Sequence, residues 1–298
     1  MNMTPSCPTT IRQLTALLAP PYDQDEARDI VLLLLSEAFH LSLTDVACGA
    51  LASLSPSDHR RLMEMMERLR QHEPVQYVLG KTTFCHRVFH VDKNVLIPRP
   101  ETQSLCGLIV DEWDRPYCGL QPPEPIKVLD VGTGSGCIAV TLALSLPCSK
   151  VTGWDVSGNA LLVARDNAHR LGAKVDWKLC DALSLPEENV ARQWDVIVSN
   201  PPYIAESERK DMRRNVLGYE PGLALFVPDA DPLRFYRAIA SYAARSLRSQ
   251  GKIYFEVNPR FASKVAQLLL SLGFVQVETI DDNFGRQRMV RGTLPCAR

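Results

Sequence analysis

The sequence has no C-x-x-C pair, although it contains nine cysteines. They are odd in number and scattered along the chain, at Cys7, Cys48, Cys85, Cys106, Cys118, Cys137, Cys148, Cys180 and Cys296. Disulfide frameworks need an even number of cysteines, and zinc sites commonly need closely spaced pairs. We therefore expect reduced thiols, no metal site and a cytoplasmic protein.

The sequence has no large excess of either charge, because its 33 Lys and Arg residues nearly balance its 34 Asp and Glu residues. The formal net charge is -1. Proteins that are drawn to nucleic acids or anionic membranes carry a basic field. Long hydrophobic runs are also missing: residues 30–35 are too few to cross a bilayer, and residues 1–10 lack the pattern of a signal peptide. We expect no stable nucleic-acid partner and no membrane association.

The chain is long enough for one large and one small domain, with 298 residues of which 46% are hydrophobic. Apolar residues recur at helical spacing over residues 10–71. This pattern predicts helices at 11–18, from 23–26 to 39, from Ser42 or Thr44, and at 57–70. We expect a small all-helical N-terminal domain over residues 1–73. Looser alternation then predicts a linker β-hairpin over residues 74–97.

Strand and helix patterns alternate after residue 98, which is typical of an open α/β sheet. The predicted strands are 127–131, 151–155, 175–179, 196–199 and 251–257, with a closing antiparallel pair at 274–280 and 288–291. The predicted helices are 102–113, 137–146, 160–171, 232–248 and 262–272. The charged run 206–211 is interpreted as a solvated, mobile segment. We expect a Rossmann-like α/β domain over residues 98–298.

A glycine-rich turn lies between a predicted strand and a predicted helix. Residues 130–136 read Asp-Val-Gly-Thr-Gly-Ser-Gly, and glycine lets a ligand approach the backbone closely. Asp155 ends the next strand, where a carboxylate can accept both hydroxyls of a ribose. Together they predict a site for a nucleoside cofactor. A dinucleotide loop would read G-x-G-x-x-G, but position 137 is Cys.

A second motif, Ser-Asn-Pro-Pro-Tyr at residues 199–203, follows a strand-like run. Asn200 offers a side-chain carbonyl oxygen, Pro201 and Pro202 remove two backbone donors, and Tyr203 supplies a flat ring. Such a loop suits a planar group that carries an NH2. The alternative is a proline-rich turn with an Asn cap.

The G-x-G-x-G turn behind an acid resembles that of class I S-adenosyl-L-methionine-dependent methyltransferases. The resemblance implies S-adenosyl-L-methionine as the cofactor and the class I methyltransferase sheet as the fold. The implied cofactor contacts are Asp130, Gly132, Thr133, Gly134, Ser135, Gly136, Asp155, Asp181, Ala182 and Asn200. Asp181 would lie near the adenine amino group, although an ordinary turn aspartate is an alternative interpretation.

Separated motifs along the chain resemble, in order, the HemK/PrmC family of peptide chain release factor glutamine methyltransferases. They are Glu-Pro-Val-Gln-Tyr at 73–77, Leu-Ile-Pro-Arg-Pro-Glu-Thr at 96–102, the glycine turn, Asn-Pro-Pro-Tyr-Ile at 200–204, Glu220-Pro221 with Ala224-Leu225, and Asp282 with Gly285 and Arg288. The resemblance implies methylation of the side-chain amide of the glutamine in the Gly-Gly-Gln (GGQ) motif of release factors. The helical N-terminal domain would then be a platform for the release factor.

The resemblance also implies roles around the Asn-Pro-Pro-Tyr loop. Asn200, Pro201 and Tyr203 would be catalytic, because the Asn200 oxygen and the Pro201 carbonyl can each accept one N–H of the amide while the Tyr203 ring packs against its plane. Pro202 would join them in contacting the substrate. Alignment would then be the main catalytic device, and oriented reactions gain up to ~7–11 kcal/mol in this way. Arg99 and Glu101 would form a lip of the site, or else a surface ion pair around a helix start.

Three positions depart from the family pattern, namely Gln103, Ala182 and Asn258.

Three other functions remain as alternatives. A ribosomal-protein glutamine methyltransferase usually has Arg-Ser-Pro where this chain has Arg-Pro-Glu, and an adenine methyltransferase needs a basic surface and a flipped base. A non-catalytic binding module would not need both loops intact. We expect a monomeric enzyme.

Overall fold

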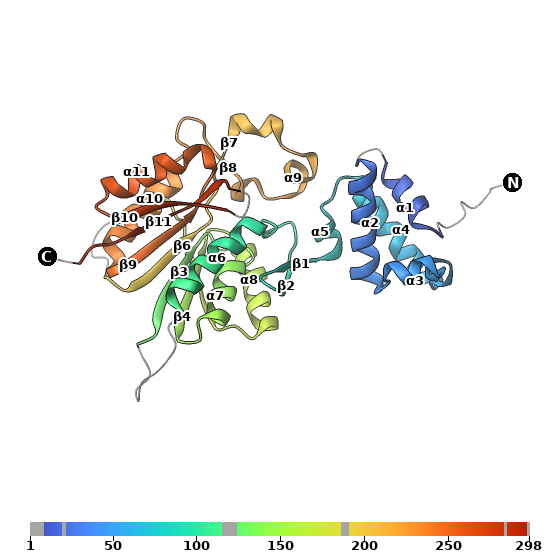
Figure 1. The fold of residues 1–298 in the computed structure, drawn as a ribbon, viewed down its shortest axis with the longest axis horizontal. Helices are drawn as coiled ribbons and strands as arrows, with labels where there is room; N and C mark the ends of the chain where they lie inside the picture. Colours follow the sequence, from blue (N-terminus) through green and yellow to red (C-terminus); the bar gives the residue numbers. More distant parts are fainter. Residues whose placement is uncertain (1–8, 20–21, 115–123, 186–190, 283–284, 297–298) are drawn as a thin grey trace. The chain divides into compact units, whose positions relative to one another are not determined.

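The computed structural model describes residues 9–19, 22–114, 124–185, 191–282 and 285–296. The chain forms two compact units. The helical unit comprises residues 1–81 with 213–219, and the sheet unit comprises residues 82–212 with 220–298. Figure 1 draws the ribbon, in which the first helices are blue and the last strands red.

The helical unit is built from short amphipathic helices. They are α1 Ile11–Leu18, α2 Gln24–Phe39, α3 Leu43–Ala47, the 3-10 turn η1 Ala50–Ser53, α4 Pro56–Arg70, α5 Val75–Leu79 and α9 Arg214–Tyr219. The side chains of Thr10, Asp23, Ser42 and Ser55 each accept a backbone N–H of the first turn and so cap α1 to α4. The predicted helices are confirmed, each within a few residues.

The hairpin prediction was wrong for residues 75–79, which form α5 instead of a strand. Pro74 stands at its N-cap, and Gly80 closes it in the left-handed conformation with φ 69°. Val78 is buried in the core of the helical unit, so packing overrides the loose alternation of the sequence. The hairpin is shorter than predicted and consists of β1 Lys81–Phe84 and β2 Arg87–His90.

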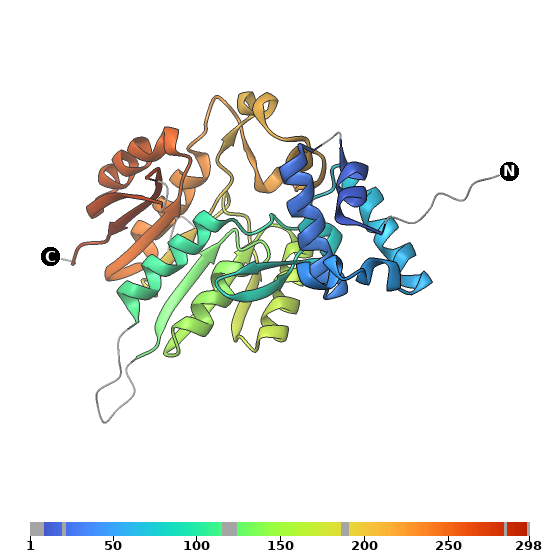
Figure 2. The same ribbon diagram turned by 45° about the vertical axis from the view of Figure 1, so that its right-hand side comes forward.

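The sheet unit contains a seven-stranded sheet in the order β10-β11-β9-β6-β3-β4-β5, which Figure 2 shows from a second side. Its strands are β3 Ile126–Val131, β4 Ser149–Asp155, β5 Val175–Leu179, β6 Trp194–Ser199, β9 Leu247–Glu256, β10 Val275–Asp281 and β11 Gln287–Thr293. Neighbours from β5 to β9 pair in parallel, and β11 pairs antiparallel with both β9 and β10. The predicted Rossmann-like α/β sheet with its closing antiparallel pair is confirmed.

Helices pack on both faces of this sheet. They are α6 Pro100–Trp113, α7 Cys137–Ser145, α8 Gly158–Leu171, α10 Arg234–Ser246 and α11 Ala262–Ser271. One buried cluster joins α10 and α11 to one face, and a second joins α6, α7 and α8 to the other. Several predicted boundaries differ from the observed ones by two or more residues, and two of these differences have a clear cause. Helix α6 begins at Pro100, because proline is favoured at the first helical position. Helix α10 ends at Ser246, because Leu247 already pairs with Trp194 in the sheet.

The charged segment after the Asn-Pro-Pro-Tyr loop is solvated as predicted, because all of its residues except Glu208 are exposed. Its mobility stays a prediction. The segment forms the 3-10 helix η2 Glu206–Asp211, next to a two-stranded parallel ribbon of β7 Ile204–Ala205 and β8 Phe226–Val227. Glu208 of η2 accepts the backbone N–H of Ala205 at 3.0 Å. Two further 3-10 turns are η3 Gly222–Ala224 and η4 Pro259–Phe261.

The strand order places three motifs at one edge of the sheet. The chain winds from β3 to β4 in one direction and continues through β6 in the other, so a crevice opens at the carboxyl ends of these strands. The glycine turn follows β3, Asp155 ends β4, and Asn200 follows β6. The topology therefore brings together residues that are far apart in the sequence.

We predict that Gly153→Ala destabilises the sheet unit. A Cβ at Gly153 would lie 2.5 Å and 2.7 Å from ring atoms of Trp177, whose backbone is paired with Gly153 between β4 and β5. Overpacking of this kind costs about 1–3 kcal/mol. Urea unfolding should show the loss, with Gly158→Ala as the matched control because its Cβ would meet nothing within 4 Å. Equal midpoints for both variants would contradict the prediction.

Candidate active site

A cavity of about 260 Å³ opens at this edge of the sheet unit, and we call it the site cavity. Eleven of the predicted site residues line it, namely Arg99, Gly132, Thr133, Gly134, Ser135, Asp155, Asp181, Ala182, Asn200, Pro201 and Pro202. Four predicted residues, Glu101, Asp130, Gly136 and Tyr203, are not among the lining residues. Most of the predicted site is therefore brought together around one hollow.

Asp130 shapes the glycine turn from beneath. Its carboxyl oxygen Oδ2 accepts the Thr133 hydroxyl at 2.5 Å and the Ala139 N–H at 3.2 Å, and the side chain is fully buried. Among the described residues, Oδ1 has no hydrogen-bond partner. Burial raises the pKa of Asp130 to about 7, against the opposing effect of these two hydrogen bonds. Asp130 thus holds the turn without reaching the cavity.

We predict that Asp130→Asn makes stability less dependent on pH. A raised pKa means that the folded protein holds this proton between about pH 4 and pH 7 while the unfolded chain has lost it. The Asp130 contribution is therefore fully present below about pH 4 and is lost as the pH rises through about 7. Urea unfolding should show the variant gaining on the wild type from pH 5 to pH 8. An equal difference at both pH values would refute this assignment.

The glycine turn needs its glycines for conformation. Gly132 and Gly134 have φ of 74° and 56°, and a Cβ on either would meet nothing within 4 Å. Side chains there would project into open space beside the cavity that a ligand could fill. Gly136 has φ of 78° and is also crowded, because a Cβ would lie 3.0 Å from the Trp177 ring.

Asp155 lies between the turn and the cavity. Its Oδ2 accepts the Gly134 N–H and its Oδ1 accepts the Ser157 N–H, each at 2.8 Å, and the residue is 9% exposed. Burial is the main reason that its pKa is raised. A carboxylate has about four acceptor positions, so both oxygens can still accept further hydrogen bonds. Asp155 fits the predicted contact with a ribose.

Asp181 has the contact of an ordinary turn aspartate and also lines the cavity. Its Oδ1 accepts the Leu183 N–H at 2.8 Å, which is the contact of a turn aspartate, and the residue is also part of the cavity wall. Val156, Ala182 and Leu183 add apolar surface to this part of the wall. Acids beside apolar surface and an open glycine turn match the chemistry of an adenosine group, so the residues present fit the predicted cofactor.

The orientation of Asn200 is set by Thr102, a residue of the motif at 96–102 for which the sequence predicted no role of its own. The Asn200 Nδ2 donates to the Thr102 hydroxyl at 3.2 Å, and that hydroxyl donates to Glu256 at 2.6 Å. Thr102 and Glu256 are 2% and 1% exposed. The bond uses the nitrogen of Asn200, so its side-chain oxygen is the atom that can accept from a ligand.

Tyr203 is not among the residues that line the site cavity. Its hydroxyl donates to Glu256 at 3.3 Å, and its ring packs against the cluster formed with α10 and α11. Burial raises its pKa above the usual range. The expected packing of the Tyr203 ring against a substrate stays a prediction.

Arg99 pairs with Glu220 at 2.5 Å and not with Glu101. The Glu220 side chain is 1% exposed, and it also accepts the Ile97 N–H at 3.1 Å. This pairing fixes the segment before α6 at the rim of the cavity. Glu101 lies half-buried in the first turn of α6.

The three departures from the family pattern all have contacts in the sheet unit. Gln103 accepts the Cys85 N–H at 2.8 Å and so ties the hairpin turn to α6. Asn258 is 8% exposed and donates to Glu208 at 3.3 Å, which joins the end of β9 to η2. Ala182 lines the cavity.

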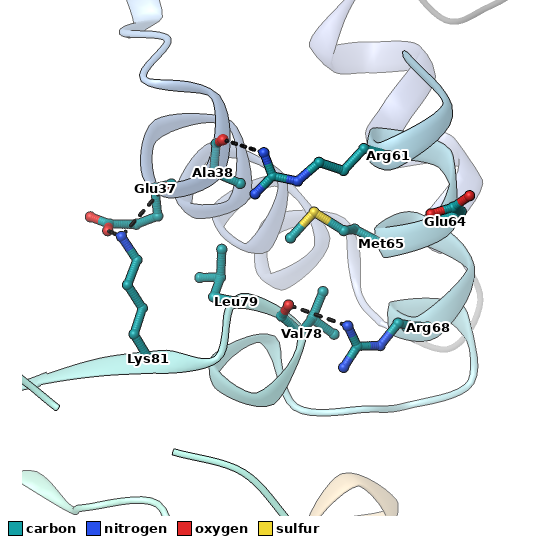
Figure 3. Close-up of a pocket in the computed structure, with 9 residues that line it drawn as sticks. All are labelled: Glu37, Ala38, Arg61, Glu64, Met65, Arg68, Val78, Leu79 and Lys81. Carbon is teal, nitrogen blue, oxygen red and sulfur yellow. Dashed lines mark hydrogen bonds and ion pairs between the residues drawn. The ribbon is translucent and has the colours of Figure 1, made fainter. Parts of the chain in front are cut away.

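A second cavity, of about 440 Å³, lies within the helical unit and is shown in Figure 3. Its cations are paired within the chain: Lys81 with Glu37 at 2.6 Å, Arg68 with the Val78 carbonyl at 3.3 Å, and Arg61 with the Ala38 carbonyl at 3.4 Å. None of the predicted site residues lines it. The chemistry therefore centres on the site cavity.

The described residues contain no group of three or more His, Cys, Asp or Glu residues that could hold a metal ion. Within the same ranges, no helix is both long and apolar enough to cross a membrane.

The fold and the cavity define a class of protein, the methyltransferases. Residues 119–217 match the methyltransferase small domain, and residues 9–80 match the PrmC N-terminal domain. Methyltransferases of this kind use S-adenosyl-L-methionine, the cofactor predicted from the glycine turn.

Individual relatives narrow the class to one family. A release factor glutamine methyltransferase of Bacteroides thetaiotaomicron is 40% identical over 94% of this chain and 96% of its own, and that of Flavobacterium psychrophilum is 38% identical over the same shares. A solved structure of a release factor-specific protein-(glutamine-N5) methyltransferase from Alicyclobacillus acidocaldarius is 30% identical, with 70% of this chain and 99% of that chain covered and a TM-score of 0.41. The chain belongs to the release factor glutamine methyltransferase family, which confirms the resemblance found in the sequence.

Proposed function

We propose that this protein transfers the methyl group of S-adenosyl-L-methionine to the side-chain amide nitrogen of the GGQ glutamine of peptide chain release factors, giving N5-methylglutamine. Besides family membership, one structural observation supports this proposal. Asn200 lies in the same cavity as the glycine turn and Asp155, with its amide nitrogen held by Thr102. A hydrogen-bond acceptor is thereby presented beside the place for the cofactor.

The residues that would hold the cofactor divide along the cavity. Asp155 would accept the ribose hydroxyls, Asp181 would lie near the adenine amino group, and the open face of Gly132 and Gly134 would admit the methionine portion. When bound, S-adenosyl-L-methionine supplies an electrophilic methyl group on a sulfonium. No other cofactor is needed for the step.

The remaining problem is the substrate, because the lone pair of an amide nitrogen is delocalised. The Asn200 side-chain oxygen and the Pro201 carbonyl each accept one N–H, which turns the nitrogen toward the methyl group. The nitrogen would take the methyl group from the sulfonium, which would leave as a thioether, and would then lose one proton to solvent. Holding the two reactants in line is the contribution of the chain to the rate.

The other parts of the molecule have proposed roles of their own. Pro202, Arg99 and Glu101 would bound the substrate channel, and the Tyr203 ring would support the loop or contact the amide plane. The helical domain would bind the release factor, and the match of residues 9–80 to the PrmC N-terminal domain supports this role. We also propose that the enzyme is monomeric and cytoplasmic and does not bind nucleic acid or membrane stably.

Transfer of a labelled methyl group tests the proposal. The acceptors are purified release factor and the same factor with its GGQ glutamine changed to alanine. Label on the unmodified factor alone, located on glutamine by peptide mass spectrometry, is the expected result. Equal label on both factors would refute the target, as would label only on ribosomal protein or nucleic acid.

A further inference from the structure

Beneath the Asn-Pro-Pro-Tyr loop, the structure contains a buried chain of hydrogen bonds that ends on a carboxylate. Asn200 Nδ2 donates to Thr102 Oγ1 at 3.2 Å, and Thr102 donates to Glu256 Oε2 at 2.6 Å. Tyr203 donates to the other oxygen, Oε1, at 3.3 Å. Three elements meet here, since Thr102 lies on α6, Glu256 ends β9, and Asn200 and Tyr203 follow β6.

The direction of each bond follows from chemistry. An ionised carboxylate only accepts hydrogen bonds, so the Thr102 hydroxyl uses its one O–H to donate to Glu256. The Thr102 oxygen can then only accept, and the part of Asn200 that can donate is its NH2 group. The Asn200 oxygen is left for the ligand. A donor at position 256 could reverse the order, because Thr102 could then give its proton to the Asn200 oxygen.

Binding of a substrate amide requires the Asn200 oxygen, and not its NH2 group, to face the substrate. The substrate NH2 is a donor, and an Asn200 NH2 turned toward it would place two donors against each other. Reversal would therefore replace a favourable contact by a repulsive one. The carboxylate beneath the loop thus decides whether the acceptor faces the substrate.

We infer that Glu256 is a positioning residue, acting through Thr102 to keep the side-chain oxygen of Asn200 turned toward the substrate amide. The inference rests on the proposed function. Tyr203 belongs to the same hydrogen-bond chain, because its hydroxyl donates to the second oxygen of Glu256. Both oxygens of the carboxylate therefore act as acceptors.

Other charged and titratable groups also face Glu256. They are Glu101 of α6, Cys137 of α7, Arg288 of β11, Tyr203 after β6 and Tyr236 of α10, whose hydroxyl donates to the Glu256 carbonyl at 3.1 Å. Burial raises the pKa of Glu256 to about 7, while the hydrogen bonds from Thr102 and Tyr203 and the charge of Arg288 act in the opposite direction. Protonation of Glu256 would make it a hydrogen-bond donor and could turn Asn200 around. We therefore expect kcat to fall as the pH is lowered through about 7.

Variants at Thr102 test the connection. Thr102→Val keeps the shape and removes the hydroxyl, and Thr102→Ser keeps the hydroxyl. A neutral hydrogen bond contributes about 0.5–1.5 kcal/mol, so Thr102→Val should lower kcat up to about tenfold and Thr102→Ser should restore most of it. A Thr102→Ser enzyme as slow as Thr102→Val, or a Thr102→Val enzyme as fast as the wild type, would overturn the inference.

Glu256→Gln tests the carboxylate itself. It should lower kcat and remove the fall in kcat near pH 7. The matched control is Glu112→Gln, because Glu112 is a carboxylate of the same helix as Thr102 that pairs with Lys252 and Arg291 but does not line the cavity. The control should keep the wild-type pH profile. A pH limb retained in Glu256→Gln would refute the role of Glu256.

A second measurement does not require a methyl-accepting substrate. The side-chain amide signals of Asn200, assigned in 15N spectra by their loss in Asn200→Ala, should shift with pH in the wild type. They should not shift in Glu256→Gln, and Thr102→Val should move them while Thr102→Ser should not. If release factor is not methylated, these spectra still decide the inference, because pH-independent Asn200 signals in the wild type would contradict it.

Discussion

Replacing Asn200 by alanine should lower kcat for release factor methylation by roughly 10²- to 10³-fold, the loss found when one preorganised hydrogen-bonding group is removed from an active site. The alanine removes the oxygen that would accept an amide N–H, and it also leaves Thr102 without the NH2 group that donates to it. The substrate NH2 group would then be held by the Pro201 carbonyl alone. Most of the gain from alignment would be lost.

The measurement separates the chemical step from cofactor binding. Single-turnover methylation with saturating S-adenosyl-L-methionine gives the rate, and calorimetry with S-adenosylhomocysteine gives the cofactor Kd. We expect the rate to fall steeply while Kd changes by less than about tenfold, equivalent to one neutral hydrogen bond. A rate within about tenfold of the wild type would refute the amide clamp, because the predicted loss exceeds that of an ordinary hydrogen bond. A large rise in Kd would instead assign Asn200 to the cofactor.

The sequence predicted the parts of this site that depend on local structure. A glycine turn between a strand and a helix, and an Asn-Pro-Pro-Tyr loop after a strand, are patterns that each segment forms by itself. Parallel strands bring their carboxyl ends to one edge of a sheet, so the amino-acid sequence alone was enough to place Gly134, Asp155 and Asn200 together. The cavity lining confirms that placement.

The contacts that orient the site could not be predicted in the same way. Thr102 and Glu256 are separated by 154 residues, and their hydrogen bond exists because α6 packs against β9. One signal was available, since Glu256 follows the apolar run Ile-Tyr-Phe at 253–255 of a strand. A carboxylate at the end of a buried strand is rarely buried without a partner.

One error has a clear physical origin. Residues 75–79 alternate loosely enough to resemble a strand, but Val78 gains more by packing into the helical core. The Tyr203 side chain is likewise held by tertiary contacts, with Glu256 and with the cluster around α10, which no local pattern could predict. Short segments have weak local preferences, so packing decides their conformation.

Replacing Asp155 by alanine should have the opposite kinetic signature to Asn200→Ala. Hydrogen bonds to a charged group contribute about 1.5–3 kcal/mol, which corresponds to a rise of roughly 10- to 150-fold in the KM for S-adenosyl-L-methionine. The effect has two sources. The carboxylate would accept the ribose hydroxyls, and it already holds the Gly134 N–H at 2.8 Å, so the glycine turn also loses an anchor.

With saturating cofactor, the Asp155→Ala enzyme should methylate release factor at a rate close to that of the wild type, because Asn200 and its partners remain. Asp155→Asn should be intermediate, since its one oxygen can accept only some of the bonds from Gly134, Ser157 and the expected ribose hydroxyls. Initial rates over a range of cofactor concentrations measure both constants. A fall in kcat with unchanged KM would show that Asp155 acts on the chemical step, and cofactor binding would then have to depend on Asp181 and the apolar wall.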